Sequence, residues 1–373
     1  MPEENEIAQI KSSQLLHARE SIGLSLEESA RRLNVDKQTL HSWEEGETYP
    51  DSEQLYELAT AYRRPIAYFF EETVEERMPL DLRGGAGVVP GVITSTIREG
   101  LRQFKIYCKL QWELETVLDK AISIDIDSAT LDDDPESLAS RVRQRISYPG
   151  GRRNSFPRLR RILNERGIKV FGLSLPQEID GAALWHTKYG PAILVNLSTV
   201  LQRRFFTLVH EYAHLMLMAH EKKLTSVLCN LNDEGEIEHF CNRLAAAFLV
   251  PRDEFKVYLL DKGLRQSDFF NIDILADVAH DFKVSRHVIA IRLEETKEAD
   301  KGFYWKIKDQ FQEVRPQFLR RKKEWKRKKE DVFGNHYTKL ALEALKSGRL
   351  TRASLSRYMD LRLVQAEGLL KST

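Results

Sequence analysis

The hydrophobic and polar positions near the amino terminus follow the period of short amphipathic helices separated by turns. Ser25 and Asp36 stand where helix N-caps are needed, and Asn34 and Val35 leave a tight connection between the helices that flank them. The pattern predicts helices at residues 13–21, 26–33, 37–45 and 52–62, followed by a short fifth helix after Pro65. The second and third of these form a helix-turn-helix unit.

The pattern changes in the middle of the chain. A long amphipathic helix is predicted over residues 95–122, where it could carry dimer contacts, and an acidic connector follows at residues 125–134. A helix is then predicted at residues 158–166. Short apolar runs broken by Pro, Gly and Asp predict the strands of a small sheet at residues 168–173, 181–186 and 192–196.

An apolar helical stretch then surrounds the motif His210-Glu211-Tyr212-Ala213-His214. On an α-helix, residues four apart are separated by about 40° of rotation and one turn of rise, so both imidazoles can meet one tetrahedral zinc ion. Glu211 lies beside that ion, where it can take a proton from an attacking water and pass it to a leaving amine. Because buried histidines and a buried glutamate need partners, the pattern predicts a metal site.

The sequence offers alternatives for the third protein ligand. If the helix runs on, His220 lies about 240° round from His214 and cannot reach the same ion. Glu238 opens a second predicted helix, residues 238–250, whose alanine-rich middle allows close packing. Glu238 would complete a His-His-Glu set and leave one position open for water, and His239 is the alternative ligand.

Two segments resemble the ImmA/IrrE family of metallopeptidases. Arg204-Phe205-Phe206-Thr207 precedes the motif, and residues 238–251 match the form Glu-x-x-x-Asn-x-x-Ala-Ala-x-x-Leu-x-Pro. The resemblance implies cleavage of regulatory proteins, typically DNA-bound repressors, by a gluzincin-like zinc site with the ligands His210, His214 and Glu238 and the general base Glu211. Two departures, Tyr212-Ala213 for Leu-Gly and Met218 for a histidine, affect the wall of the site and no ligand.

An edge strand beside the active helix of a zinc peptidase can pair with the backbone of an extended substrate. The sequence leaves open which predicted strand has this position. His186, at the end of the second strand, could assist near the scissile bond, although a histidine on the sheet surface is the simpler interpretation.

Residues 10–72 resemble the lambda Cro/repressor (XRE) DNA-binding domain, including its ending Trp43-Glu44-x-Gly46-x-x-x-Pro50. In such domains the third helix enters the major groove, and a dimer reads two half-sites. The resemblance therefore implies a homodimer on operator DNA with the candidate contacts Lys37, Gln38, Thr39, His41 and Ser42, of which Gln38 best suits adenine. Leu26 stands where relatives often carry a glutamine that contacts phosphate.

Composition limits the class of protein. Lys and Arg total 57 against 56 Asp and Glu, so the net charge of +1 gives no global sign of nucleic-acid binding, and a DNA-binding surface must be local. Cys108, Cys229 and Cys241 form no spaced pair, which argues against a disulfide framework. The amino terminus lacks signal-peptide features and no stretch approaches a membrane span, so we expect a soluble cytoplasmic protein with no membrane partner.

The last third of the chain is predicted to be helical. Residues 274–279 and 282–293 predict a helix, a short turn and a second helix. They resemble the helix-turn-helix-like subdomain that packs mainly on the catalytic unit in the same family. A second DNA contact by this subdomain is also possible. Residues 315–329 hold nine basic residues and one acid, and could bind phosphates, an acidic partner or only solvent. Further helices are clearest at residues 340–346 and 352–358.

We therefore expect a mainly α chain with a small β-sheet (α+β). Its parts are a five-helix XRE-type domain (10–72), a helical linker (73–150), a zinc metallopeptidase domain (151–297) and a helical carboxy-terminal region (298–373). The expected function is a cytosolic DNA-binding regulator whose zinc endopeptidase cleaves a repressor or toxin-type partner at specific sites. The alternative is a non-cleaving transcriptional regulator or antitoxin that uses the peptidase fold to bind a partner protein.

Overall fold

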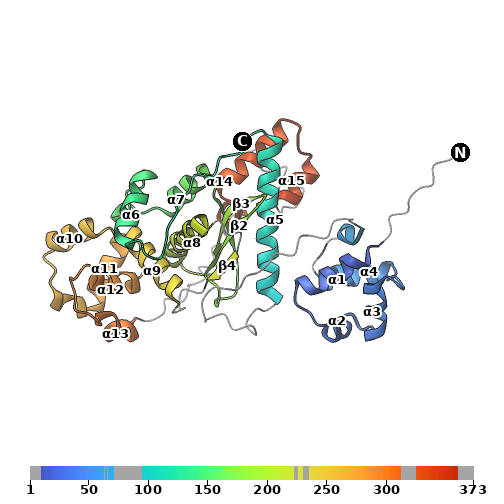
Figure 1. Ribbon diagram of the computed structural model, residues 1–373, viewed down its shortest axis with the longest axis horizontal. Coiled ribbons are helices and arrows are strands. Elements are labelled where there is room, and N and C mark those ends of the chain that lie inside the picture. The colour runs from blue at the N-terminus through green and yellow to red at the C-terminus, as the bar shows by residue number, and fades with distance from the viewer. Residues whose placement is uncertain are drawn as a thin grey trace. The chain divides into compact units, whose positions relative to one another are not determined.

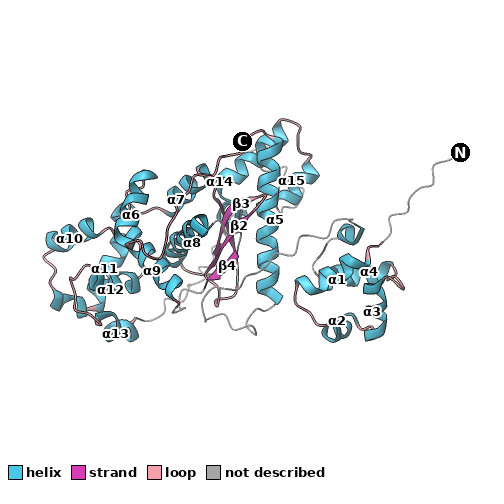
Figure 2. Cartoon of the chain, in the orientation of Figure 1, coloured by secondary structure: helices cyan, strands magenta, loops and turns pink. Residues whose placement is uncertain are grey.

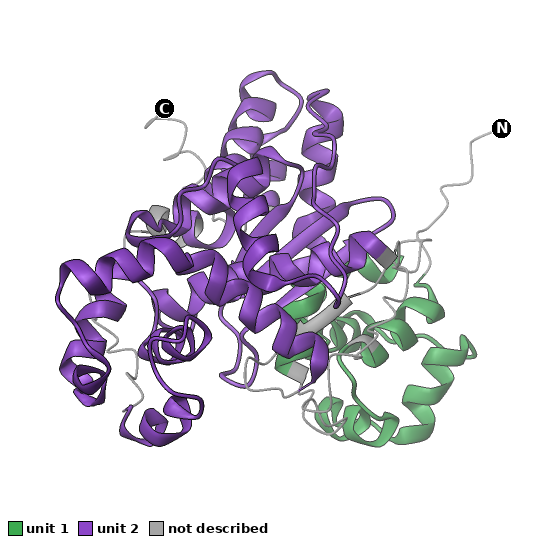
Figure 3. Cartoon of the chain, turned by 60° about the vertical axis from the view of Figure 1, so that its left-hand side comes forward, with its two compact units in different colours: residues 1–79, 90–103 green, residues 80–89, 104–373 purple. Residues whose placement is uncertain are grey.

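A computed structural model describes residues 10–62, 64, 66–70, 95–221, 226–229, 235–311 and 325–359. It divides the chain into two compact units, residues 1–79 with 90–103 and residues 80–89 with 104–373 (Figure 3). Helices dominate both units and the second also holds a small sheet, which confirms the predicted α+β class (Figure 2). None of the helices in the described ranges combines the length and the apolar character needed to cross a bilayer.

In its described residues the first unit contains five short helical segments, and the second and third begin at the predicted caps. The five segments are α1 (Ser12–Ser21), α2 (Leu26–Leu33), α3 (Lys37–Glu45), α4 (Ser52–Ala61) and the 3-10 helix η1 (Ile66–Phe70) (Figure 1). Ser25 accepts a hydrogen bond from the backbone N–H of Glu28, and Asp36 accepts from those of Gln38 and Thr39. The expected fifth helix is thus a short 3-10 segment, and the apolar faces of all five meet in one core that includes Leu15, Leu33, Leu40, Leu58 and Phe69.

The second unit contains most of the helices. In chain order they are α5 (Ser95–Val117, shared with the first unit), α6 (Pro135–Arg145), the 3-10 helix η2 (Gly151–Arg153), α7 (Phe156–Glu165), α8 (Leu201–Glu221), α9 (Glu236–Leu249), α10 (Arg252–Asp261), η3 (Gln266–Phe270), α11 (Ile272–Phe282), α12 (Arg286–Glu295), α13 (Phe303–Ile307), η4 (Lys308–Gln310), α14 (Trp325–Lys346) and α15 (Arg352–Tyr358). α6, α10 and α13 were not predicted. The side chains of the basic segment 315–329 lie outside the described part of the chain.

The sheet has four strands in the order β1-β3-β2-β4. The predicted strands are β1 (Lys169–Leu173), β2 (Gly181–His186) and β3 (Gly190–Asn196), and an unpredicted one is β4 (Ser226–Cys229). β1 pairs with β3 in parallel, whereas β2 runs antiparallel to both β3 and β4. β4 is therefore the edge strand next to β2.

Alternate residues of the strands face two different helical layers. Val170 of β1 belongs to the hydrophobic core on the side of α8. Phe171 points to the opposite face, where its ring packs against Phe104 and Tyr107 of α5 and against Tyr337 of α14. The sheet is thus covered on both faces, which explains why its strands are almost continuously apolar.

Helix α5 differs from its prediction in length and in what it packs against. It ends at Val117 instead of residue 122, because Asp119 adopts a positive φ of 54° and the N–H of Lys120 bonds back to the carbonyl of Glu115. From Phe104 onward its apolar face lies on the sheet. That face is therefore not available for the dimer contacts that its amphipathic pattern had indicated.

Candidate metal centre

The histidine motif lies in the middle of α8. This helix continues through the position where a glycine would let it turn, and it stays buried from Thr207 to Met216. His210 and His214 are one turn apart, and their residues are 0 % and 2 % exposed. His220 follows on the same continuous helix but is exposed to solvent. It is not brought to the other two histidines, in agreement with the helical geometry.

Glu238 reaches the two histidines from a second helix. α9 packs along α8, and its alanine-rich middle is fully buried (Figure 1). The carboxylate of Glu238 lies 2.9 Å from Nε2 of His210 through Oε2, and 3.2 Å from Nε2 of His214 through Oε1. The two Nε2 atoms are 3.1 Å apart. The neighbouring His239 is exposed, so Glu238 is the residue that completes the cluster.

The spacing of these three donor atoms fits a metal ion. Four-coordinate zinc with bonds of about 2.0–2.2 Å separates its ligand atoms by roughly 3.3–3.6 Å. The observed separations of 2.9–3.2 Å are slightly shorter and lie on one face of such a tetrahedron. Because the buried group combines two imidazoles with one carboxylate, it could hold a metal ion.

The environment favours the protonation states that a metal ligand needs. Burial alone would raise the pKa of Glu238, but hydrogen bonds with His210 and His214 outweigh it and lower this pKa to about 2. Burial lowers the pKa of His210, against the opposing effects of Glu238 and Asn242. At neutral pH the carboxylate is therefore ionised and His210 is neutral. Burial also raises the pKa of Cys241 well above its usual value, which keeps this nearby thiol protonated.

Glu211 is completely buried and lies against the start of β2. A Cβ atom at Gly181 would come within 2.7 Å of Oε1 of Glu211 and within 2.6 Å of Cγ2 of Thr207. Any larger residue at position 181 would therefore push against the glutamate. Gly181 is a site residue that the sequence reasoning missed, and its one visible signal was a glycine at the start of a strand.

His186 is not brought to this site. It ends β2, five residues from Gly181, which at about 3.3 Å per residue places it on the order of 16 Å away. Its ring stacks on that of Tyr189 with centroids 4.1 Å apart, and its Nδ1 accepts a hydrogen bond from the backbone N–H of Lys188. The interpretation as a histidine of the sheet surface therefore fits the structure.

Side chains from three separate segments hold the carboxy-terminal end of α9. The last carbonyls of a helix have no partner within it. Here Nη1 of Arg143 donates to the carbonyls of Ala247 (2.7 Å) and Phe248 (3.3 Å). Asn154 Nδ2 donates to the next carbonyl, that of Leu249 (2.8 Å), and Arg292 Nε donates to that of Val250 (3.0 Å). The helix that carries Glu238 is therefore fixed at its far end.

The candidate DNA contacts lie on α3 in the first unit. Gln38 and His41 are exposed, and their side chains form no hydrogen bond within the described residues. The other candidates already have partners: Lys37 pairs with Glu27, Thr39 Oγ1 donates to Asp36 (3.3 Å), and Ser42 Oγ donates to Thr39 O (2.9 Å). Gln38 and His41 are thus the two side chains of the predicted set that can bind DNA without first breaking another hydrogen bond.

Comparison with known protein families matches two parts of the chain. Residues 163–294 match the IrrE N-terminal-like domain, and residues 15–69 match a helix-turn-helix domain. No curated protein matches the chain. The first match contains the His-His-Glu cluster and the second contains α3. The chain therefore combines a DNA-binding helix-turn-helix domain of the XRE type with a metallopeptidase-type domain of the ImmA/IrrE kind, the combination expected of a DNA-binding regulator.

Proposed function

We propose that this chain, which carries a helix-turn-helix domain and an IrrE N-terminal-like domain, is a regulator whose second domain is a zinc-dependent, site-specific endopeptidase. Its substrate would be a regulatory protein such as a repressor or a toxin-type partner. The observation that carries the proposal is the placement of Glu211, a buried carboxylate, one residue after His210 in a cluster of three converging donors.

Each side chain of the cluster has a definite role in this proposal. His210, His214 and Glu238 would hold the ion. A bound zinc ion would lower the pKa of water towards neutrality and polarise a substrate carbonyl. Glu211 would accept the proton of the attacking water and then deliver it to the leaving amine. Gly181 leaves the space that keeps this carboxylate in position.

Strand β4 is suited to hold an extended substrate. It pairs with β2 alone among the described strands, and its last residue, Cys229, is opposite Gly181, which lies against Glu211. A peptide that adds to the outer edge of β4 would gain main-chain hydrogen bonds and run close to the general base. This arrangement supports cleavage within an extended segment of a protein.

The first unit would bring the peptidase to DNA. The helix-turn-helix domain supports DNA binding, and we propose a homodimer that reads two operator half-sites through the exposed end of α3. The reducing cytoplasm is the matching compartment for operator binding and for the buried free thiols of Cys108 and Cys241.

One observation favours a second candidate function. His210, Glu211, His214 and Glu238 are each no more than 2 % exposed, so a substrate carbonyl reaches them only if the surrounding chain moves. A regulator or antitoxin that binds a partner protein and cleaves nothing would not need such a movement. The same burial is also compatible with a peptidase that is active only under certain conditions.

The two functions are separated by replacing the general base. We would compare new protein amino termini by mass spectrometry in cells expressing the wild type, Glu211→Gln or Glu236→Gln, at matched levels and with added zinc. Glu236 is exposed at the start of α9 and controls for the loss of one carboxylate. Cuts in one or a few proteins with wild type and Glu236→Gln, but not with Glu211→Gln, are expected. Identical termini in all three would support the non-cleaving regulator.

The metal assignment predicts a contrast between two histidines of the same helix. His214→Gln removes a donor of the cluster, whereas His220→Gln alters an exposed histidine further along α8. We expect about one zinc ion per chain in the wild type and in His220→Gln, and a loss of most of the zinc in His214→Gln. Elemental analysis after dialysis measures the ratio. Equal zinc content in both variants would contradict the assignment.

A further inference from the structure

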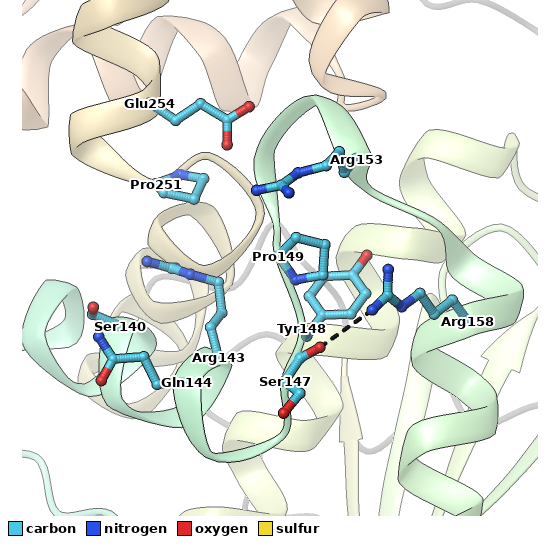
Figure 4. Close-up of a pocket in the computed structure, with 10 residues that line it drawn as sticks. All are labelled: Ser140, Arg143, Gln144, Ser147, Tyr148, Pro149, Arg153, Arg158, Pro251 and Glu254. Carbon is cyan, nitrogen blue, oxygen red and sulfur yellow. Dashed lines mark hydrogen bonds between the residues drawn. The ribbon is translucent and has the colours of Figure 1, made fainter.

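An open pocket, called the cavity below, lies on the surface of the peptidase-type unit, and none of its lining residues belongs to the His-His-Glu cluster. It has a volume of about 500 Å³, within the range of ligand sites in proteins. Figure 4 shows that its arginines come from separate segments: Arg143 from α6, Arg153 from η2 and Arg158 from α7. Tyr148 and Pro251 supply apolar wall between them. The cavity therefore combines a basic lining with a small apolar surface.

None of these three arginines forms a close ion pair with an acidic side chain of the described residues. Arg143 donates to the backbone carbonyls at the end of α9, and Arg158 Nη2 donates to the carbonyl of Ser147 (3.3 Å). The side chain of Arg153 forms no hydrogen bond or ion pair with any described residue. The lining has one carboxylate, Glu254, and its Oε1 already accepts the N–H of Arg152 (3.1 Å) and lies 3.7 Å from that residue's guanidinium. Arginines thus outnumber carboxylates in the lining of the cavity by three to one.

Arg143 is buried, so its positive charge is energetically unfavourable. The residue is 9 % exposed, and burial is the main reason that its pKa is lowered to about 10. The nearby carboxylates of Glu136, Glu254 and Asp253 offset this burial only in part, so an anion in the cavity would stabilise the Arg143 cation further. Guanidinium groups present paired N–H donors that match the oxygens of phosphate. The chemistry of the lining therefore selects for an oxyanion.

We propose that this cavity is a binding site for a small molecule that carries a phosphate group. The exposed Arg153 and Arg158 contact the phosphate directly, and the buried Arg143 supplies further positive charge. The size of the cavity leaves room for more than one phosphate ion. Binding is expected whether or not the His-His-Glu site cleaves a protein, so this proposal stands apart from the peptidase function.

Occupancy of the cavity would also act on α9. Arg143 lines the cavity and at the same time bonds the last carbonyls of the helix that carries Glu238. From Glu238 to Ala247 is about 14 Å along the helix. A ligand that orders Arg143 would therefore stabilise the end of α9 opposite to the metal ligand, which gives the chain a route for a small molecule to affect the site.

Titration calorimetry with pyrophosphate, on the full chain loaded with zinc and at fixed ionic strength, tests the proposal. Arg153→Gln and Arg158→Gln each remove one guanidinium group and keep a polar, uncharged side chain in its place. Arg161→Gln is the matched control, since it removes the same charge from α7 at an exposed position outside the cavity. Arg143 is left intact because its loss would free the carbonyls of α9.

We expect pyrophosphate to bind the wild type and Arg161→Gln equally. Each of the two cavity variants should weaken binding by about tenfold or more, since a charge-assisted hydrogen bond is lost. Unchanged zinc content and thermal unfolding in the variants would show that they are folded. Absence of pyrophosphate binding to the wild type, or equal weakening in all three variants, would overturn the proposal.

Discussion

Two helix-turn-helix segments, α2–α3 and α11–α12, have the same corner in their backbones. Each first helix ends in a residue with left-handed conformation, Asn34 (φ 51°) or Lys283 (φ 57°). A valine follows, and its N–H bonds to the carbonyl of an alanine one turn back, at 3.1 Å in the first segment and 3.0 Å in the second. The second helix is then capped by Asp36 or Ser285. The local chemistry of the corner is therefore the same in both.

The two second helices differ in what covers them. α3 leaves Lys37, Gln38 and His41 exposed, whereas Val288, Ile289, Ala290 and Leu293 of α12 are buried. The one exposed residue at the start of α12, His287, lies between Tyr304 (3.3 Å) and the ring of Phe311. A turn motif thus predicts the corner, and the polarity of the following helix decides whether it can read DNA. α12 packs as the family resemblance implied, and its burial argues against a second DNA contact.

The largest expected effect is on stability, when the residues at two equivalent positions are exchanged between the two segments. His41 and Ala290 occupy the same place after their corners. Ala290→His forces an imidazole into a fully buried site, and should destabilise α12 by about 3 kcal/mol or more. His41→Ala in the exposed face of α3 should change stability by less than about 0.5 kcal/mol. Amide hydrogen exchange measures both opening free energies, and similar values would contradict the comparison.

DNA binding should be sensitive to one segment alone. Gln38→Ala removes a side chain that can bond an adenine, and should weaken operator binding by about 1–3 kcal/mol. His287→Ala, at the equivalent position of α12, should leave it unchanged. Fluorescence anisotropy at constant salt, on a duplex selected by the full chain, measures both. A loss of affinity with His287→Ala as large as with Gln38→Ala would mean that α12 also contacts DNA.

The metal cluster was predictable because most of it is local. A four-residue spacing on one helix brings His210 and His214 together wherever that helix lies. Glu238 required one further step, the packing of an alanine-rich helix, and the structure does place its carboxylate within 3.2 Å of both imidazoles. The contact between Gly181 and Glu211 depends on how the sheet sits against α8. No spacing in the sequence contains that information.

The missed elements had weaker or different signals. α6 begins with Asp134 as N-cap and Pro135 at its first position, a recognisable start that was included in a linker. β4 is four residues long and is defined by its pairing with β2, so periodicity could not identify it. The arginine-lined cavity is formed only when α6, η2, α7 and the end of α9 meet. Short strands and cavities are thus properties of the tertiary structure.

The smallest predicted effect concerns the charge of the DNA-binding unit. Residues 10–70 hold seven Lys and Arg against ten Asp and Glu, which is unfavourable for contact with phosphates. Lys37, at the exposed start of α3, is held by Glu27, and this hydrogen bond is the main reason that the pKa of Glu27 is lowered. Glu27→Gln should release the lysine and raise operator affinity by about two- to fivefold.

A control variant separates this release from the general change in charge. Glu53→Gln removes one exposed carboxylate from α4, and Glu53 forms no ion pair within the described residues. If Lys37 contacts a phosphate once it is free, Glu27→Gln should also make the salt dependence of binding steeper, whereas Glu53→Gln should raise affinity less and leave the slope unchanged. Equal behaviour of the two variants would show that Lys37 stays away from the DNA backbone, and α3 would then meet the operator through Gln38 and His41.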